Sequence, residues 1–344
     1  NNSKENLNKL QNQLDSLLDE IENYIDESKK LTKDIELAQS RVKNFIRETP
    51  LEYSPYFSDL TGANVWFKLE NIQLTGSFKI RGAYNKLLCM TEKQRAKGCV
   101  AASSGNHGAA VSYAMNSLGI KGIIFVPEHT STTKADAISR YGSEISFFGT
   151  DGLDTENHAR KYDLDNNLEY LSPYNDIDVI CGQGTCGIEI TNQLPKTDAV
   201  FIAVGGGGLI SGVSLYLKSF NSGIRIVSCQ PEASAIMTES VNAGKILHLP
   251  SKKTLSDGTV GGIESEAITF QLCSDLVDGY VVVSEEDIGQ AMRSFIDSHH
   301  MLIEGAAGVA IAGCLAKKEE YLGKNIVIII CGGNISRETL KQVI

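Results

Sequence analysis

The sequence predicts an α/β protein with two open, twisted, mostly parallel sheets and flanking helices, preceded by an N-terminal helical extension. Short apolar strands alternate with helical segments along most of the chain, which is typical of parallel sheets with crossover helices. The alternation occurs in two sets, separated by a polar stretch over 151–173 that we expect to be irregular. The chain has 344 residues, of which 42% are hydrophobic, so at roughly 150 residues per domain we expect about two domains.

The elements of both sets are short and are bounded by glycine, proline or polar residues. The expected strands are Asn64–Leu69, Val100–Ala102, Gly122–Val126, Glu144–Phe148, Ala199–Val204, Arg225–Ser228 and Ile326–Cys331. The expected helices are Ala109–Leu118, Thr133–Arg140 and Leu209–Phe220. Because open parallel sheets bind ligands at the carboxyl ends of their strands, the residues that follow these strands are the first candidates for a site.

Residues 1–35 have a different pattern, in which apolar side chains recur at alternating spacings of three and four. These side chains are Leu7, Leu10, Leu14, Leu17, Ile21 and Tyr24. The spacing is typical of a coiled-coil seam. A single amphipathic helix packed on its own domain explains it equally well, because isolated helices of this length are marginal in water. Both alternatives stay open for this segment.

Composition limits the classes of partner and compartment. The formal net charge of −10 argues against sequence-independent binding of nucleic acid. The longest strongly apolar stretch, Ile326–Cys331, is far shorter than the ~20 residues that span a bilayer, and no charged-then-apolar leader marks the chain for secretion. The eight cysteines form no C-x-x-C pair and the six histidines show no metal-ligand spacing. We therefore expect a cytoplasmic protein without structural metal or membrane attachment.

The strongest chemical signal is the run Gly205–Gly208, between an expected strand and an expected helix. Glycines let the backbone approach an anion closely, and a helix N-terminus presents free N–H groups at a positive dipole end. The run matches neither G-x-G-x-x-G nor G-x-x-x-x-G-K-[ST]. It therefore predicts a phosphate site of another kind, and tight strand–helix packing is the structural alternative.

Three further segments carry candidate side chains. The turn Ser103–Gly108 offers N–H donors to a carboxylate, and Asn106 within it can hydrogen-bond a ligand hydroxyl. Lys79 lies among small and apolar neighbours, where desolvation would lower its pKa and make the amine a nucleophile. Cys331 ends the most apolar strand and would point into the same crevice. Taken singly, each segment has an ordinary structural explanation: the turn is polar, the lysine is solvated and the thiol is buried.

In this order, Ser77-Phe78-Lys79-Ile80-Arg81-Gly82-Ala83, Ser103-Ser104-Gly105-Asn106-His107-Gly108 and the four glycines resemble the fold-type II pyridoxal-phosphate enzymes, whose fold is like that of tryptophan synthase β. Within that group the chain resembles the serine/threonine dehydratases, or threonine ammonia-lyases, and the serine racemases. The resemblance runs from about Asp34 to the C-terminus and includes Thr49-Pro50-Leu51, Gly182-Gln183-Gly184-Thr185 and Ser256-Asp257-Gly258. It implies a large cofactor-binding domain over 36–90 and 173–344, with a small domain over 91–172 inserted in it.

The resemblance also implies roles for individual residues around pyridoxal 5'-phosphate. Lys79 would form a Schiff base with the cofactor aldehyde and, once released, take the Cα proton; Ser104 is the second expected catalytic residue. The expected cofactor-binding residues are Lys79, Phe78 on the pyridine ring, Asn106 at the 3′-hydroxyl, Gly205, Gly206, Gly207, Gly208 and Leu209 at the phosphate, and Cys331 at the pyridine nitrogen. The expected residues at the substrate carboxylate are Ser103, Ser104, Asn106 and His107. A neutral thiol would leave the pyridine unprotonated and a weaker electron sink, which favours prompt β-elimination over transamination.

Three expectations follow from positions at which this sequence differs from the family pattern. Gln230 and Ile236 stand where some members bind a divalent cation through acidic residues, and nearby Glu232 is expected to be solvated, so we expect no metal. The run Gly258–Glu264 differs from that of the usual threonine dehydratases, so the accepted side chain can differ from that of threonine. The chain ends ten residues after Asn334, so no C-terminal regulatory domain is expected.

The activity implied by the resemblance is a lyase reaction of amino-acid metabolism, in which L-threonine or L-serine gives a 2-oxo acid and ammonia. A serine racemase, or a dehydratase of 3-hydroxyaspartate or phenylserine, is the alternative within the fold. A non-catalytic amino-acid-binding or assembly protein is the alternative of another class. The expected partner is a small-molecule amino acid, and a homodimer or homotetramer is expected, as for many soluble enzymes.

Overall fold

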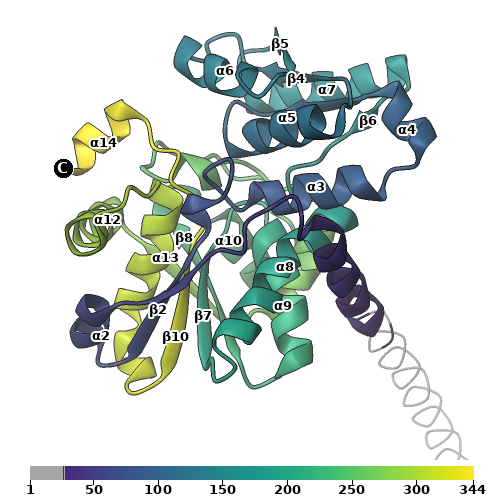
Figure 1. Cartoon of the computed structure of the whole chain (residues 1–344). Helices are drawn as coiled ribbons and strands as arrows, with labels where there is room; N and C mark the ends of the chain where they lie inside the picture. The colour runs from purple at the N-terminus through teal and green to yellow at the C-terminus, as the bar shows by residue number, and fades with distance from the viewer. Residues whose placement is uncertain (1–25, 27) are drawn as a thin grey trace, which may run out of the picture.

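The computed structural model of this protein describes residue 26 and residues 28–344, and it contains two sheets in separate lobes (Figure 1). The larger sheet has six strands in the order β1-β2-β10-β7-β8-β9. They are β1 (Leu51–Tyr53), β2 (Asn64–Leu69), β7 (Ala199–Ala203), β8 (Arg225–Pro231), β9 (Gly279–Val283) and β10 (Asn325–Ile330). Strand β1 is antiparallel to β2, and all other neighbours are parallel.

The smaller sheet has four parallel strands in the order β5-β4-β3-β6. They are β3 (Cys99–Ala102), β4 (Gly122–Val126), β5 (Glu144–Phe147) and β6 (Glu169–Tyr170). All four lie inside the segment 91–172, for which the resemblance predicts an inserted domain. The domain boundaries themselves stay a prediction.

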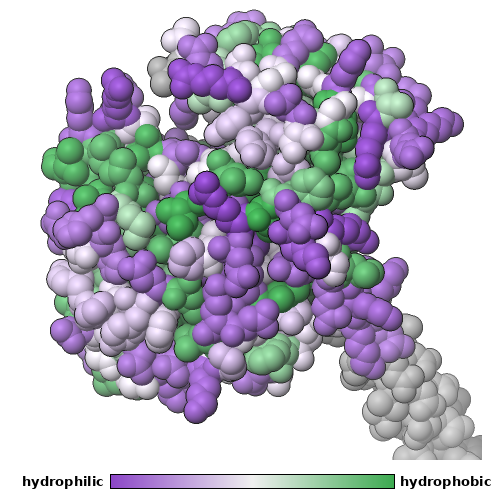
Figure 2. Space-filling view, in the orientation of Figure 1, coloured by the Kyte–Doolittle hydropathy of each residue, from purple (hydrophilic) through white to green (hydrophobic). Residues whose placement is uncertain are grey.

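Helices cover both sheets. They are α2 (Pro55–Thr61), α3 (Lys79–Cys89), α4 (Glu92–Lys97), α5 (Asn106–Leu118), α6 (Thr132–Ser139), α7 (Gly152–Asn166), α8 (Ile177–Gln193), α9 (Gly208–Phe220), α10 (Ile236–Ala243), α11 (Ile268–Leu276), α12 (Glu285–His299), α13 (Gly305–Ala316) and α14 (Arg337–Val343). Figure 1 shows α8 and α9 on one side of the large sheet and α12 and α13 on the other. None of the helices in the described part of the chain has the length and apolar character that crossing a membrane requires. On the face in Figure 2, hydrophobic residues gather around α14 and between the lobes, and most of the rest is polar.

The fold class and every expected strand are confirmed, with small shifts at the strand ends. The start of one helix differs in a way that matters for the site. Helix α5 begins at Asn106 and not at Ala109, because Gly105 serves as its N-cap residue. The backbone N–H groups of Asn106 and His107 therefore belong to the first helical turn, where N–H groups have no partner within the helix.

The expectation that 151–173 is irregular is wrong, because this stretch contains α7 and β6. The side chain of Asp151 caps α7 by accepting a hydrogen bond from the N–H of Asp154. The buried residues of α7 are Thr155 and Ala159, and Ala159 packs in a small cluster with Val100 and Phe125. So narrow an apolar stripe gives little helical periodicity in the sequence.

The N-terminal helix continues past residue 35, where the extension was predicted to end. A helix over 28–42 buries Ile35, Ala38 and Val42 completely. Ile35 and Ala38 pack in one cluster with Ile180 of α8 and Leu215 of α9. This part of the segment is thus a helix packed on its own fold. The residues with the heptad spacing, Leu7 to Tyr24, lie outside the described residues.

Four charged side chains are buried together beside the start of α3. Arg81 donates from Nη2 to Glu70 Oε1 at 2.7 Å and from Nη1 to Glu189 Oε1 at 2.7 Å. Lys68 Nζ donates to Glu189 Oε2 at 2.6 Å. Each of the four is at most 2% exposed, so two positive and two negative charges balance without water. We call these four residues the buried charge cluster.

The buried charge cluster predicts a large loss of stability when one charge is removed. Glu189→Gln would leave Lys68 and Arg81 facing a single carboxylate, which costs about 3–5 kcal/mol for a buried pair. Urea unfolding followed by circular dichroism measures the change. Lys161→Gln is the control, because it breaks the exposed ion pair with Asp165 and should cost less than about 1 kcal/mol. Equal losses in the two variants would contradict the prediction.

Candidate active site

Lys79 is the first residue of α3, and the chain just before it is held against the segment that follows β10. Ser77 forms an antiparallel bridge with Gly332, and the N–H of Phe78 donates to Cys331 O at 3.0 Å. Two of the segments chosen from the sequence, 75–83 and 331–334, therefore lie side by side. The Lys79 Nζ donates to Pro173 O at 2.8 Å and lies 5.2 Å from the centroid of the Phe78 ring.

The amine of Lys79 is shifted toward its neutral form. Burial lowers its pKa to about 8, although the nearby Cys331 and Glu304 act in the opposite direction. An amine with this pKa is partly unprotonated near neutral pH and can act as a nucleophile or base. The desolvation expected from the sequence is therefore present at this residue.

The turn Ser103–Gly108 joins β3 to α5 and presents the first turn of that helix. Gly108 has no space for a side chain, because an added Cβ would collide with Ser103 O. The His107 ring turns away from the turn, with Nε2 at 2.8 Å from Leu171 O. Burial, aided by the charge of Lys79, lowers the pKa of His107 to about 3 and keeps the ring neutral. His107 thus offers its backbone N–H, and not a charge, to a ligand.

Asn106 contacts two side chains that come from distant parts of the chain. Its Nδ2 donates to both carboxyl oxygens of Glu304, at 3.0 and 2.9 Å. Its Oδ1 accepts from Asn334 Nδ2 at 2.7 Å. The thiol of Cys331 lies 3.9 Å from Glu304 Oε1. Asn106 and Cys331 are thus brought together around Glu304, whose charge also acts on Lys79.

Burial also controls the ionisation of the two acidic groups beside Lys79. It raises the pKa of Glu304 to about 7, while hydrogen bonds from Asn106 act to lower it. It raises the pKa of the Cys331 thiol well above its usual value, and the nearby carboxyl of Glu304 adds to the shift. Cys331 is therefore a neutral thiol.

The glycine run forms the connection from β7 to α9, which begins at Gly208. Gly207 has a φ of 89°, in the left-handed region that favours glycine. A Cβ on Gly206 or Gly208 would collide with Tyr174, and one on Gly205 would lie 3.1 Å from the backbone of Thr259. The run is therefore enclosed by neighbours and needs its glycines. Leu209, in the first turn of α9, is buried.

Tyr174 links the glycine run to Lys79 and to the loop over 256–267. It follows Pro173, the partner of Lys79, and its hydroxyl accepts from the N–H of Glu264 at 2.9 Å. The Glu264 carboxylate accepts from Asn175 Nδ2 at 2.8 Å and forms an ion pair with Arg160 of α7 at 2.9 Å. The run Gly258–Glu264, noted for its unusual sequence, thus contacts both the small lobe and the glycine run.

Gln230, at the position where the resemblance places an acidic cation ligand, uses its side-chain amide within the protein. Its Oε1 accepts from Thr238 N and Oγ1 at 2.8 and 2.7 Å, and its Nε2 donates to Val204 O at 3.1 Å. Glu232 is exposed, as expected. The amide of Gln230 therefore joins the ends of β7 and β8 to α10.

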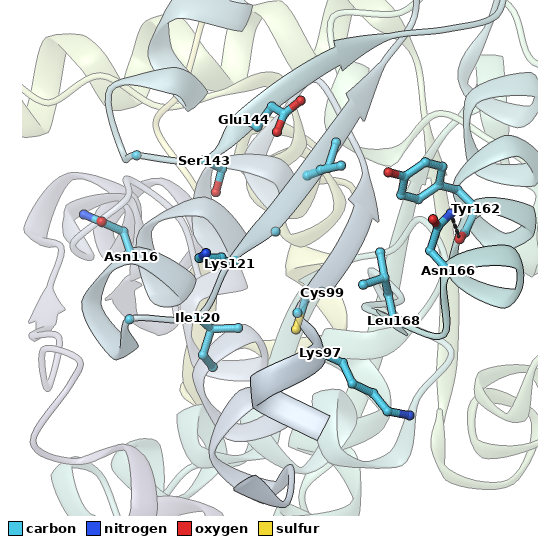
Figure 3. A pocket seen from close by; sticks show the side chains of 15 residues that line it. Lys97, Cys99, Asn116, Ile120, Lys121, Ser143, Glu144, Tyr162, Asn166 and Leu168 are labelled. Atoms are coloured by element: carbon cyan, nitrogen blue, oxygen red, sulfur yellow. Dashed lines mark hydrogen bonds between the residues drawn. The ribbon is translucent and has the colours of Figure 1, made fainter. Parts of the chain in front are cut away.

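A pocket of about 660 Å³ lies elsewhere, at the amino ends of β3, β4 and β5 (Figure 3). Lys97, Lys121, Ser143 and Glu144 are among the residues that line it. Ser103–Gly108, the turn of the candidate site, follows the carboxyl end of β3. The pocket is therefore on the other end of the small sheet and is separate from the site.

Sequence reasoning missed Glu304, Tyr174 and Asn175. Glu304 carried a signal: it is a single acidic residue between Ile303 and the apolar helix α13, and it is 4% exposed. A carboxyl in such surroundings requires hydrogen-bond partners, so it marks a built polar site. Tyr174 and Asn175 lie in a polar connection and carried no comparable signal.

Comparisons with known proteins identify the family of this chain. The profile of the family described as "Pyridoxal-phosphate dependent enzyme" matches residues 42–332. An L-threonine ammonia-lyase of Thermotoga maritima is 37% identical over 312 residues, which cover 91% of this chain and 77% of the relative.

Two solved structures extend the comparison. The processed form of threonine deaminase isoform 2 from Solanum lycopersicum is 35% identical, with a TM-score of 0.89 over 92% of each chain. Maize serine racemase is 32% identical, with a TM-score of 0.85 over 90% of this chain and 95% of that one. The protein belongs to the family of pyridoxal-phosphate-dependent enzymes, with the fold of threonine deaminases and serine racemases.

Proposed function

We propose that this protein is an ammonia-lyase that converts L-threonine or L-serine to the corresponding 2-oxo acid and ammonia by β-elimination. The observation that carries the proposal is the buried amine of Lys79, with a pKa lowered to about 8, near Cys331 and near Glu304, which is bonded to Asn106. The similarity to an L-threonine ammonia-lyase and to a threonine deaminase supports the choice of substrate.

The residues at the site fit pyridoxal 5'-phosphate. The hydroxyl of Ser77, two residues before Lys79, is buried without a hydrogen-bond partner. The glycine run leaves backbone N–H groups bare at the start of α9, which suits a phosphate. Lys79 would hold the aldehyde, Gly205–Gly208 with Leu209 the phosphate, and Phe78, Asn106 and Cys331 the ring.

Bound at this site, the cofactor supplies an aldehyde for amines and a ring that withdraws electrons from the bond between Cα and its hydrogen. Lys79 Nζ is the base that takes the proton from Cα, since its lowered pKa leaves much of the amine neutral. The N–H groups of Asn106 and His107, with the hydroxyls of Ser103 and Ser104, hold the substrate carboxylate at the start of α5.

Racemisation is the second candidate, because maize serine racemase is similar over 90% of this chain. Dehydration of 3-hydroxyaspartate or phenylserine is a further alternative, since Gly258–Glu264 departs from the usual threonine dehydratase sequence. A substrate panel that measures 2-oxo acid release and D-amino acid formation separates these activities. The intact Lys79 and glycine run argue against a protein that only binds amino acids.

We further propose a homodimer or homotetramer in the cytoplasm. The eight cysteines all have free thiols, which suits a reducing compartment. Many soluble enzymes form symmetric homo-oligomers. The proposed partner in catalysis is a small-molecule amino acid.

The first test is chemical trapping combined with that panel. Borohydride reduction of the yellow holoenzyme should fix the cofactor on Lys79, as peptide mass spectrometry would show. Lys79→Ala should lower ammonia release from L-threonine by roughly 10²–10⁴-fold, because it removes the base. Lys161→Ala on the surface is the matched lysine control. An adduct on another lysine would reject the assignment.

A second prediction concerns the ionisation of Lys79. In protein freed of cofactor, acylation of Lys79 should rise with pH around a midpoint near 8, against 10.5 for an ordinary lysine amine. The sign follows from burial, which disfavours the charged form and leaves more neutral amine at lower pH. Labelling in urea is the control, because unfolding should return the midpoint toward 10.5. A midpoint that is the same in both conditions would contradict the shift.

A third prediction concerns divalent cations. Because the neutral amide of Gln230 already bonds to Thr238 and Val204, we expect no cation-dependent activity through that position. Ammonia release should be unchanged after treatment with EDTA and after addition of Mg²⁺. Loss of activity that Mg²⁺ restores would show the prediction to be wrong.

A further inference from the structure

The backbone around Glu304 fixes the position of this residue in the site. It immediately precedes α13, and its N–H donates to Gly332 O at 3.1 Å. A Cβ on Gly332 would lie 2.6 Å from Glu304 Oε2, and one on Gly258 would lie 3.4 Å from Oε1. The missing side chain at Gly332 therefore leaves space that the carboxyl group fills, and Gly258 lies at ordinary contact distance from it.

The amide of Asn106 is held at both of its ends. The Glu304 carboxyl can accept hydrogen bonds, so it selects the nitrogen end, at 3.0 and 2.9 Å. Asn334 Nδ2 is a donor, so it selects the oxygen end, at 2.7 Å. Asn334 is itself oriented, because the same nitrogen donates to Thr75 O at 2.8 Å. An asparagine amide has nearly the same shape in its two orientations, and only such partners distinguish them.

We propose that Glu304 is a positioning residue for the cofactor, acting through Asn106. It holds the Nδ2 of Asn106 in one orientation, so that one N–H binds the carboxyl and the second stays directed to the ring hydroxyl of pyridoxal 5'-phosphate. Without Glu304, the amide is held only through its oxygen by Asn334, and the direction of its N–H groups is no longer fixed by an acceptor. The inference rests on the proposed cofactor role of Asn106, and it is independent of which amino acid is the substrate.

The role is separate from that of the other groups near Glu304. Lys79 bonds to Pro173 and not to Glu304. The Cys331 thiol is 3.9 Å away, a weak contact compared with the two bonds to Asn106. The effect of Glu304 on the cofactor should therefore depend on Asn106 being present.

The test is a double-mutant cycle on the holoenzyme with Glu304→Ala, Asn106→Ala and the pair. Two readouts need no substrate: cofactor loss on dialysis, giving a dissociation constant, and the visible absorption and circular dichroism of the bound cofactor. Glu304→Ala should raise the dissociation constant roughly tenfold and shift the visible band, as loss of a buried hydrogen bond predicts. In the Asn106→Ala background, Glu304→Ala should change the dissociation constant and the visible band by at most about a third of the change that it causes when Asn106 is present.

Glu304→Gln keeps the shape and one acceptor oxygen, so its dissociation constant and visible spectrum should lie between those of the wild type and Glu304→Ala. It also serves as the test variant if Glu304→Ala does not fold. Glu169→Gln is the matched control, because it alters a comparable amide–carboxylate pair with Gln94, at 2.8 Å, on β6 of the small sheet. It should leave both readouts unchanged.

Equal effects of the Glu304 variants with and without Asn106 would overturn the proposal, as would an unchanged cofactor affinity and spectrum in folded Glu304→Ala. Failure of the substrate proposal has a different signature. In that case, 2-oxo acid is released from none of the tested hydroxy amino acids, while the cofactor readouts still follow the cycle.

Discussion

The buried charge cluster of Lys68, Glu70, Arg81 and Glu189 is the constraint on which the site depends. Arg81 lies two residues after Lys79 in α3, and its partners are Glu70, directly after β2, and Glu189 of α8. Four charges without water are stable only while all are paired, because an unpaired buried charge costs several kcal/mol. The cluster therefore fixes the first turn of α3 in one position against the large sheet, together with the amine of Lys79 in that turn.

The cluster also gives the fold a dependence on acid. Burial alone raises the pKa of Glu70, but Arg81 beside it lowers the pKa below the usual 4.5. The unfolded chain therefore takes up the proton more readily than the folded one. The stabilisation is fully present above that usual value and is lost as the pH falls through the lowered pKa. Around Lys79, in contrast, burial moves the amine, the Glu304 carboxyl and the Cys331 thiol toward their neutral forms.

The sequence predicts the parts of this structure that depend on local patterns, and it does not predict those that depend on contacts between distant segments. Strands such as Asn64–Leu69 and Gly122–Val126 are apolar runs with clear breakers, and their bounds agree with the structure. Asn106 and Cys331 could be selected because they lie after or at the end of an expected strand, and Lys79 because it lies among small and apolar residues. Helix α7 was missed because two buried residues make no visible period. Tyr174 was missed because its importance comes from a contact with a segment about 90 residues away in the chain, which no local pattern reports. Glu304 had a local signal, as an acidic residue before an apolar helix, but its partner Asn106, about 200 residues away, could not be identified from that signal.

Glu264 bonds at the same time to Arg160 of the small lobe and, through its N–H, to the hydroxyl of the tyrosine that encloses the glycine run. Glu264 therefore connects the small lobe to the glycine run, so that the ordering of the two regions depends on one residue of the loop between α10 and α11.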